Sequence, residues 1–398
     1  MTNLTRDQSA NVWSDGTLSQ VPEGDSTADA LWTGGHGGYA TYRIPALIST
    51  SDGTVLAFCE GRRAGRGDSG QIDLLLRRST DGGQSWSPTQ VVVSWPGFTV
   101  GNPTPVLVRE TGDVVLVFCS NEAEAHESTI RKGLFRRAVW TVTSADGGLT
   151  WGKPIEITSQ VMRDDWTWYA TGPCHAVQLR SGRILVPCNH RHLDTEIVTL
   201  SRHAHVIYSD DLGASWNIGG GIEVEGANES VVVETSTGEI YLNSRDQHGR
   251  GYRFTARSDD GGLTFHDVGI DETLTDPPCQ ATALAITGVS GDPLVFLNPA
   301  GPGRSMLTAR VSLDEGRTWQ LPYLIHPGLA AYSDIVQVHS KPHPAPGCTE
   351  PTATLIALYE TGTDNDCDRL AQVRLTVDSA GTIRLLRMDD YQSDVICE

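Results

Sequence analysis

Arginines and carboxylates stand next to strand-like apolar runs at widely separated places in the chain. Arg43 lies in YRIPAL, and Arg62 and Asp68 lie in the Gly-rich stretch CEGRRAGRGDSG, which follows the apolar run TVLAF. Arginine stays charged at any working pH and can grip a carboxylate through two hydrogen bonds, so several arginines together predict a site for an anionic ligand. An acid on a loop can give a proton to a leaving group and take it back.

The second half of the chain supplies further arginines and acids. Glu234 ends the apolar run in NESVVVE, and Arg304 ends NPAGPGR. Arg250 lies in LNSRDQHGRGYR, which also contains Arg245 and Arg253. Spacing fixes the arginine that would bind an anionic ligand only to a few positions, so Arg245 and Arg253 are alternatives to Arg250.

A tyrosine and one more acid complete the set. Tyr332 lies in AYSDI beside Asp334, and Glu360 closes the apolar run LIALYE. A tyrosine with a neighbouring carboxylate can act as an activated nucleophile. An acid that closes an apolar strand is either exposed or paired with a buried cation.

The elements that must position these residues are predicted by a repeated phrase, Ser-x-Asp-x-Gly-x-x-Trp. Its Asp can accept backbone N–H bonds inside a turn, and its Gly permits the positive φ that a tight turn needs. The starts of the five copies lie 65, 65, 49 and 54 residues apart, within the range of propeller blades. We therefore predict an all-β, six-bladed β-propeller. The copies are Ser79–Trp86, Ser144–Trp151, Ser209–Trp216, Ser258–Phe265 and Ser312–Trp319.

The same period argues for one domain over residues 1–398, although length alone suggests two or three. Residues 1–40 are expected to form an irregular lead-in or one strand that closes the ring. No run of 18 apolar residues occurs, so no transmembrane segment is expected. The first residues lack the basic and apolar regions of a secretory leader, which favours a cytoplasmic protein, or a secreted one whose leader has been removed.

The charge of the chain bounds its partners. The formal net charge of −19 argues against nucleic acid or an anionic membrane as a main partner. An anionic small ligand would need local arginines on this acidic body. None of the eight cysteines forms a C-x-x-C pair, so we expect no metal and no cofactor.

In their order and spacing these motifs resemble the sialidases (exo-α-neuraminidases) of the bacterial and animal type. The shared marks are YRIP, EGR with a Gly-rich Asp loop, the five turns, TGP at Thr171–Pro173, VVE before an arginine, Tyr-Ser-Asp and LYE, over about residues 30–370. The resemblance implies a six-bladed β-propeller that releases terminal α-linked sialic acid from glycoconjugates or oligosaccharides, with retention of configuration and without a metal.

The resemblance also implies roles. Tyr332 matches the nucleophile, Glu234 the carboxylate that activates it, and Asp68 the general acid and base. Sialic acid carries a carboxylate on its anomeric carbon, so a neutral tyrosine approaches it more favourably than a carboxylate would, and sialidases depart from the usual two-carboxylate pattern of glycosidases.

The remaining candidates bind substrate. Arg43, Arg250 and Arg304 match the three arginines that hold the sialic acid carboxylate, and Glu360 matches the acid that orients Arg43. The list of implied contacts also includes Arg62, as an additional arginine against the substrate, and Asn102 in GNPTP, near the 4-hydroxyl of the sugar.

Two other functions compete with hydrolysis. A trans-sialidase would pass the sialyl group to another sugar with the same residues. A noncatalytic propeller with the same turns would bind glycans or proteins, but it would not need the arginines, tyrosine and acids that this chain contains.

Overall fold

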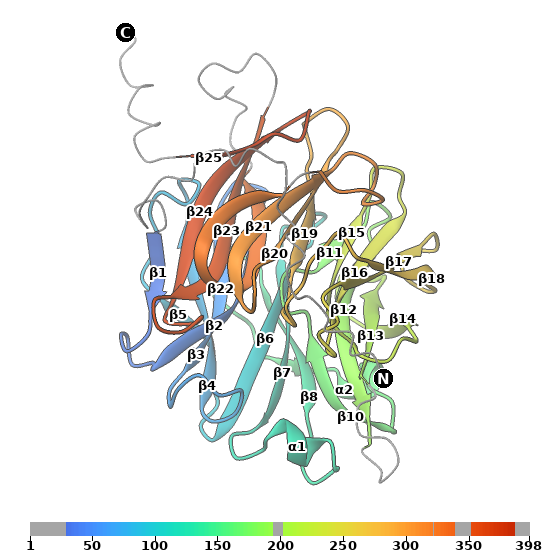
Figure 1. Cartoon of the computed structure of the whole chain (residues 1–398). Helices are drawn as coiled ribbons and strands as arrows, with labels where there is room; N and C mark the ends of the chain where they lie inside the picture. Colours follow the sequence, from blue (N-terminus) through green and yellow to red (C-terminus); the bar gives the residue numbers. More distant parts are fainter. Residues whose placement is uncertain (1–28, 194–201, 321, 339–351, 387–398) are drawn as a thin grey trace, which may run out of the picture.

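The computed structural model describes residues 29–193, 202–320, 322–338 and 352–386, and almost all of its regular structure is β-strand (Figure 1). In these ranges the helices are two single turns, α1 (Glu127–Ile130) and α2 (Thr158–Val161). The prediction of an all-β chain is confirmed. No helix in the described ranges is long and apolar enough to cross a membrane.

The first part of the chain forms an eight-stranded sheet. Its neighbours are antiparallel except for one parallel pairing, between Ile72 and Thr99, which links two antiparallel groups. The strands are β2 (Thr41–Ser49), β3 (Val55–Arg62), β4 (Ile72–Ser79), β5 (Gln90–Val93), β6 (Phe98–Leu107), β7 (Val114–Glu122), β8 (Ala138–Ser144) and β9 (Ile155–Glu156).

Two smaller antiparallel sheets follow. The five-stranded sheet contains β10 (Trp166–Thr171), β11 (Val177–Gln178), β12 (Ile184–His192), β13 (Arg202–Ser209) and β14 (Asn217–Ile222). The four-stranded sheet contains β15 (Ala227–Glu234), β16 (Ile240–Asp246), β17 (Arg253–Ser258) and β18 (His266–Asp271).

The last sheet joins the two ends of the described chain. Its long strand β22 pairs with β21 through its first part and with β23 through its second part, while β1 pairs with β24. The strands are β1 (Asp29–Thr33), β19 (Thr282–Ala285), β20 (Leu294–Pro299), β21 (Ser305–Ser312), β22 (Tyr323–Val338), β23 (Thr352–Gly362), β24 (Arg369–Asp378) and β25 (Ile383–Leu385).

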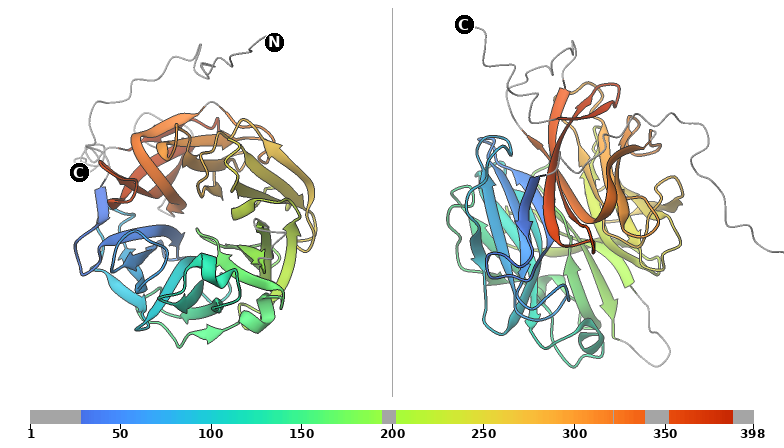
Figure 2. Two further views of the ribbon diagram at one scale, coloured as in Figure 1. Left: turned by 60° about the horizontal axis from the view of Figure 1, so that its bottom comes forward. Right: turned by 60° about the vertical axis from the view of Figure 1, so that its left-hand side comes forward.

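The strands surround a central axis, and the chain passes around it once, so that β1 lies beside β24 (Figure 2, left). This is the arrangement of a β-propeller. Because hydrogen bonds run on between neighbouring groups in both eight-stranded sheets, the count of six blades stays a prediction. The single-domain assignment also stays a prediction, and residues 1–28 of the expected lead-in lie outside the described ranges.

The repeated turns form as their chemistry predicts. In the first copy the Ser79 hydroxyl donates to Asp81 Oδ1 (2.7 Å) and accepts from Gly83 N (2.8 Å), while Ser85 N donates to Asp81 Oδ1 (2.9 Å). The φ of Gly83 is +83°. The other four copies make the same three bonds. Trp86 then donates to Gln372 on β24 (3.1 Å), so the first turn contacts the last sheet.

Buried apolar clusters lie between successive groups of strands. Leu56 and Phe58 on β3, for example, pack with Leu116 and Phe118 on β7, and all four are fully buried. Burial of this kind supplies most of the favourable free energy of folding.

Candidate active site

Tyr332 lies where the ladder between β22 and β23 loses its regular register. The pairing shifts between Ala330 and Ser333, so that two residues of β22, one of them Tyr332, oppose Glu360 alone. Such a β-bulge aims a side chain away from its regular direction and is common next to active sites. Tyr332 is 7% exposed and therefore almost enclosed.

The Tyr332 hydroxyl contacts a carboxylate and an arginine. It donates a short hydrogen bond to Glu229 Oε1. Arg245 Nη1 donates to the Tyr332 oxygen (3.1 Å) and to Glu229 Oε2 (2.6 Å), so the three side chains form a closed triangle. Glu229 also lies in a bulge, on β15, and that bulge opposes Arg245 on β16.

The predicted contact between Tyr332 and Glu234 is wrong. Glu234 ends β15, where its carboxylate accepts from the backbone N of Arg180 (2.8 Å). Five residues separate Glu229 from Glu234, which is about 16 Å along a strand at ~3.3 Å per residue. Of the two acids that flank the VVV run, only the first lies at the end of β15 that contacts Tyr332.

Three arginines surround the tyrosine ring. The guanidinium carbons of Arg43 and Arg304 each lie 5.2 Å from the ring centroid of Tyr332, and Arg245 lies at its hydroxyl. The arginines come from β2, from β16 and from the residue before β21. Arg245 Nε is buried without an acceptor among the described residues. The arrangement is a cationic cradle beside a phenol.

Arg250 is not a member of this cradle. Its guanidinium pairs with Asp246 (2.8 and 3.0 Å) in the loop after β16, and its side chain is 44% exposed. Arg253 is fully buried and donates to Asp276 (3.1 Å) and to the Cys279 carbonyl (2.7 Å). The choice of Arg250 as the second cradle arginine is thus corrected to Arg245, one of the alternatives.

Glu360 holds Arg43 in place. Arg43 Nε and Nη2 donate to the two carboxylate oxygens of Glu360, each at 3.0 Å, and Ile44 N donates to Oε1 (2.9 Å). Glu360 is fully buried, and a buried carboxylate needs such partners. This fixed pair presents the remaining Arg43 donors to the ring of Tyr332.

Asp68 stands at the rim of the cradle, on the loop between β3 and β4. Its side chain is 78% exposed, and its Oδ1 lies 2.7 Å from Arg62 Nη1 and 3.5 Å from Arg43 Nη1. Desolvation would raise the pKa of Asp68, but the charges of Arg62 and Arg43 outweigh it and hold the pKa below its usual value. Asp73, on β4 beyond this loop, is buried and accepts bonds from Tyr39 and Arg63, so it belongs to a separate network.

Asn102 lies in a bulge of β6 with a positive φ of 58°. Its backbone N donates to Glu60 Oε1 (2.8 Å), and its side-chain oxygen accepts from Arg137 (2.8 Å). Glu60 also accepts from Arg62, so Asn102 is connected to Arg62 through the Glu60 carboxylate.

The protonation states of the central pair differ. Burial, and then the charge of Glu229, raise the pKa of Tyr332 above its ordinary value, and Arg245 lowers it without reversing the shift. Burial also opposes ionisation of Glu229, but Arg245 and the Tyr332 hydroxyl hold the pKa of Glu229 below its usual value. The arrangement is therefore a neutral phenol bonded to an ionised carboxylate that can take its proton.

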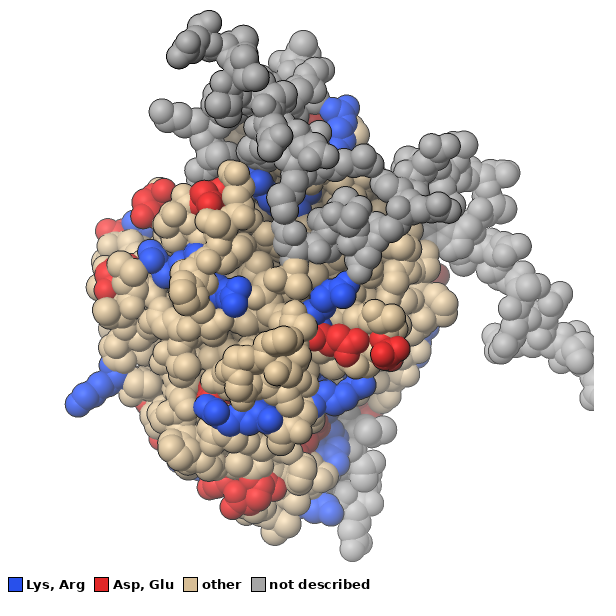
Figure 3. Space-filling model, turned by 90° about the vertical axis from the view of Figure 1, so that its left-hand side faces the viewer, with Lys and Arg blue, Asp and Glu red and all other residues tan. Residues whose placement is uncertain are grey.

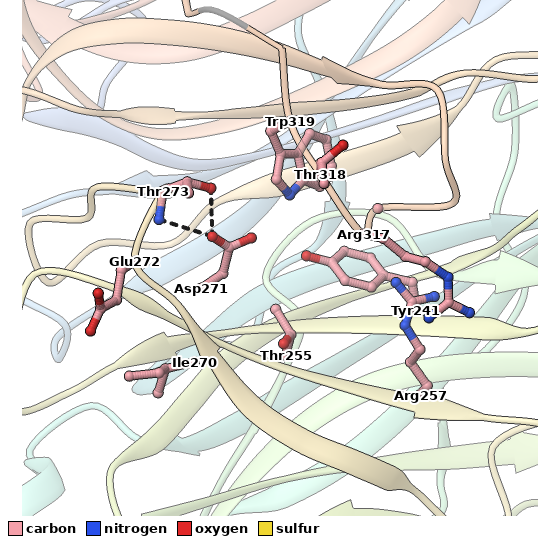
Figure 4. Close-up of a pocket in the computed structure, with 11 residues that line it drawn as sticks. Tyr241, Thr255, Arg257, Ile270, Asp271, Glu272, Thr273, Arg317, Thr318 and Trp319 are labelled. Atoms are coloured by element: carbon pink, nitrogen blue, oxygen red, sulfur yellow. Dashed lines mark hydrogen bonds between the residues drawn. The ribbon is translucent and has the colours of Figure 1, made fainter.

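Two other features of the surface do not contribute to this site. A cavity of about 620 Å³ lies against Tyr241 and Trp319, and its two arginines, Arg257 and Arg317, both pair with Glu239 (Figure 4). On the face drawn in Figure 3, basic and acidic residues are interspersed and no broad basic patch is visible. Within the described ranges, no group of three or more His, Cys, Asp or Glu could hold a metal.

Comparison with known proteins finds related sequences. A family model described as a BNR repeat-like domain matches residues 53–343. A protein named sialidase from Micromonospora viridifaciens is 33% identical over 373 residues, which cover 86% of this chain and 54% of that protein. An exo-alpha-sialidase from Aspergillus fumigatus is 31% identical over 297 residues, which cover 70% and 69%. The chain thus spans about half the length of the Micromonospora relative.

Solved structures share the fold. The Hadza microbial sialidase Hz136 superposes with a TM-score of 0.75 at 24% identity, over 91% of this chain and 68% of the other. The intramolecular trans-sialidase from Ruminococcus gnavus gives a TM-score of 0.73 at 15% identity, over 90% and 99%. At these identities the likeness shows the β-propeller fold alone.

Proposed function

The chain belongs to the sialidase family, and we propose that it is a retaining exo-α-sialidase that releases terminal α-linked sialic acid through a covalent intermediate on Tyr332. The observation that carries this proposal is the Tyr332 hydroxyl, bonded to Glu229 inside a ring of three arginines. The substrates we propose are sialylated glycoconjugates or oligosaccharides.

Substrate binding begins at the cradle. Arg43, Arg245 and Arg304 would hold the sialic acid carboxylate, and this places the anomeric carbon next to the Tyr332 oxygen. Glu360 keeps Arg43 charged and oriented for this contact. Asn102 and Arg62 would lie near the hydroxyl groups of the sugar. Binding energy is spent here on orientation, which raises the effective concentration of the nucleophile.

The chemistry has two steps. Glu229 takes the phenol proton as the Tyr332 oxygen attacks the anomeric carbon, and Asp68, which acts in its protonated form, gives that proton to the leaving oxygen. Water activated by Asp68 then attacks the same carbon and displaces Tyr332, which recovers its proton from Glu229. Two inversions at one carbon give net retention. A neutral phenol avoids the repulsion that a carboxylate nucleophile would meet from the substrate carboxylate.

The experiment is turnover of a fluorogenic aryl sialoside, with the product followed by proton NMR. Release of the α anomer before mutarotation supports a retaining hydrolase, and release of the β anomer contradicts it. A fluorinated sialosyl fluoride is expected to label Tyr332, located by mass spectrometry. Absence of turnover with intact binding of sialosides would favour the noncatalytic alternative.

A transferase remains the second candidate, because the same tyrosine, carboxylate and arginines would serve it. It would use the same covalent intermediate and differ in what attacks it. Incubation with sialyllactose and excess lactose separates the two: free sialic acid alone indicates hydrolysis, whereas sialyl transfer to lactose or an intramolecular anhydro product indicates transfer.

A further inference from the structure

We propose that Glu60 is a positioning residue which holds Arg62, and that Arg62 in turn anchors the loop carrying Asp68. In this role Arg62 acts on the reaction through Asp68. The inference rests on the proposed function, since it takes Asp68 as the acid. It assigns a function to a buried carboxylate that takes no part in the steps given above.

The anchor starts with a buried ion pair on β3. Arg62 Nε and Nη2 both donate to Glu60 Oε2, at 2.9 and 2.7 Å. The two side chains are 3% and 5% exposed. A guanidinium held through two of its nitrogens has a fixed plane, so its third nitrogen points in one direction.

That third nitrogen contacts the acid loop three times. Arg62 Nη1 donates to the Arg66 carbonyl (2.6 Å), the Gly67 carbonyl (3.0 Å) and Asp68 Oδ1 (2.7 Å). All three acceptors are consecutive in sequence, so one cation organises the turn that presents Asp68. The side chain of Asp68 is 78% exposed, and Arg62 and Arg43 are its charged partners in the described ranges.

Glu60 is itself fixed from a second strand. Its other oxygen, Oε1, accepts from Asn102 N on β6 (2.8 Å). A β-carbon at position 101 would lie 2.3 Å from the same oxygen, so Gly101 gives the carboxylate the room that it occupies. The Glu60 carboxylate is thus connected to two strands, and Arg62 extends this fixed point to the loop.

The anchor also limits the contact between Asp68 and the cradle. Asp68 Oδ1 lies 3.5 Å from Arg43 Nη1, which is needed for the substrate carboxylate. An unanchored Asp68 could move fully onto Arg43, because opposite charges attract at this range. Loss of the anchor would therefore cost proton transfer to the leaving group first, and would leave the nucleophile and its base in place.

The test is Glu60→Gln in the full chain, assayed with sialyllactose, whose leaving alcohol is basic, and with a nitrophenyl sialoside, whose phenol leaves without help. We expect kcat on sialyllactose to fall on the order of tenfold or more and kcat on the nitrophenyl substrate to fall less than about threefold. Glu239→Gln is the matched control, because Glu239 forms a comparable buried pair with Arg257 away from the site. It is expected to lower both rates equally or neither.

A double-mutant cycle separates positioning from general damage. In an Asp68→Ala background, Glu60→Gln is expected to cause no further loss in the residual turnover of sialyllactose, the substrate on which the single variant loses most, because the residue it positions is gone. Equal losses on both substrates in the single variant, or additive losses in the cycle, would overturn the proposal. If Glu60→Gln does not fold, Glu60→Asp, which keeps the charge but shortens the reach to Arg62, decides by the same ratio of rates.

The wild-type protein distinguishes this inference from the function on which it rests. If wild type cleaves neither substrate, the proposed function fails. If wild type cleaves both and the variants lose both rates in parallel, the function stands and the anchor is wrong.

Discussion

The hydroxyl of Tyr332 donates a hydrogen bond to the carboxylate of Glu229, a residue 103 positions earlier in the chain. The bond joins β22 to β15, which belong to different sheets. Arg245 contacts both partners, so it holds the carboxylate ionised while leaving the phenol neutral. This contact makes Glu229 the residue that distinguishes a nucleophilic tyrosine from an ordinary buried one.

Substitutions of the two acids of β15 are expected to differ in their effect on enzymatic activity. Glu229→Gln removes the base from Tyr332, and we expect kcat to fall about 10²–10⁴-fold, the usual value of general base catalysis. Glu234→Gln at the other end of the strand is expected to stay close to wild type. Steady-state kinetics on an aryl sialoside measures both. A large loss in Glu234→Gln together with an active Glu229→Gln would refute the assignment.

Substitutions of the arginines are expected to differ in their effect on ligand affinity. Arg304→Ala and Arg245→Ala are each expected to weaken binding of an unsaturated sialic acid analogue at least about tenfold, because a charge-assisted hydrogen bond contributes roughly 1.5–3 kcal/mol. Arg250→Ala removes only a half-exposed pair with Asp246 and is the matched control. Isothermal titration calorimetry gives the affinities. Unchanged affinity in Arg304→Ala would remove that residue from the cradle.

The role of Asp68 should depend on the leaving group. Asp68→Ala is expected to nearly abolish cleavage of a natural sialoside, whose alcohol needs a proton, and to spare much more activity on an aryl sialoside. The comparison needs kcat on both substrates with the same protein preparation. Equal losses would mean that Asp68 is not the acid.

Acid should destabilise the protein through two buried histidines on β12 and β13. Burial lowers the pKa of His205 to about 3, and burial with the neighbouring His205 lowers that of His190. Below pH ~6.5 the unfolded chain binds a proton at each of the two histidines and the folded chain does not. For each histidine, the free energy of unfolding therefore falls by about 1.4 kcal/mol with every unit by which the pH is lowered. Urea unfolding at several pH values measures the slope. His205→Gln removes one of the two histidines and is expected to lower this slope by about 1.4 kcal/mol per pH unit. An unchanged slope would contradict this account.

A buried carboxylate should carry much of the stability near the site. Asp334 is fully buried and accepts bonds from Leu47 N (2.8 Å), His175 N (3.1 Å) and the Thr282 hydroxyl (2.7 Å), which belong to separate parts of the ring. We expect Asp334→Ala to lower the free energy of unfolding by about 3–5 kcal/mol, as for a broken buried network. Asp210→Ala, which removes an exposed pair with Arg183, is expected to change it by less than about 1 kcal/mol. Similar losses in both variants would contradict the role of Asp334.

The sequence predicts the fold class well because the repeated turns are local. Each turn is specified within eight residues by a Ser, an Asp and a Gly whose bonds do not depend on distant parts of the chain. Trp86, by contrast, contacts Gln372 on the last sheet, and no local pattern predicts that partner.

The site is predicted less completely, because tertiary structure decides which end of a strand lies near Tyr332. Both Glu229 and Glu234 flank the same apolar run, and the sequence gives them equal chemistry. One signal was available: Arg43 and Tyr332 precede the apolar parts of their strands, and so does Glu229, whereas Glu234 follows its own. The preference for Arg250 over its alternative Arg245 is wrong for a similar reason, because Arg245 lies within β16 while Arg250 lies in the loop beyond it.

The register shifts in β6, β15 and β22 separate residues of the active site from the regularly paired residues of the sheets. Asn102, Glu229 and Tyr332 lie in bulges, outside the regular ladder, while the paired residues beyond them carry the packed core. A substitution at a bulge therefore removes no regular ladder pair. The ring can consequently lose or exchange its chemistry without losing its shape, which makes this architecture a tolerant platform for the divergence of new specificities and for redesign.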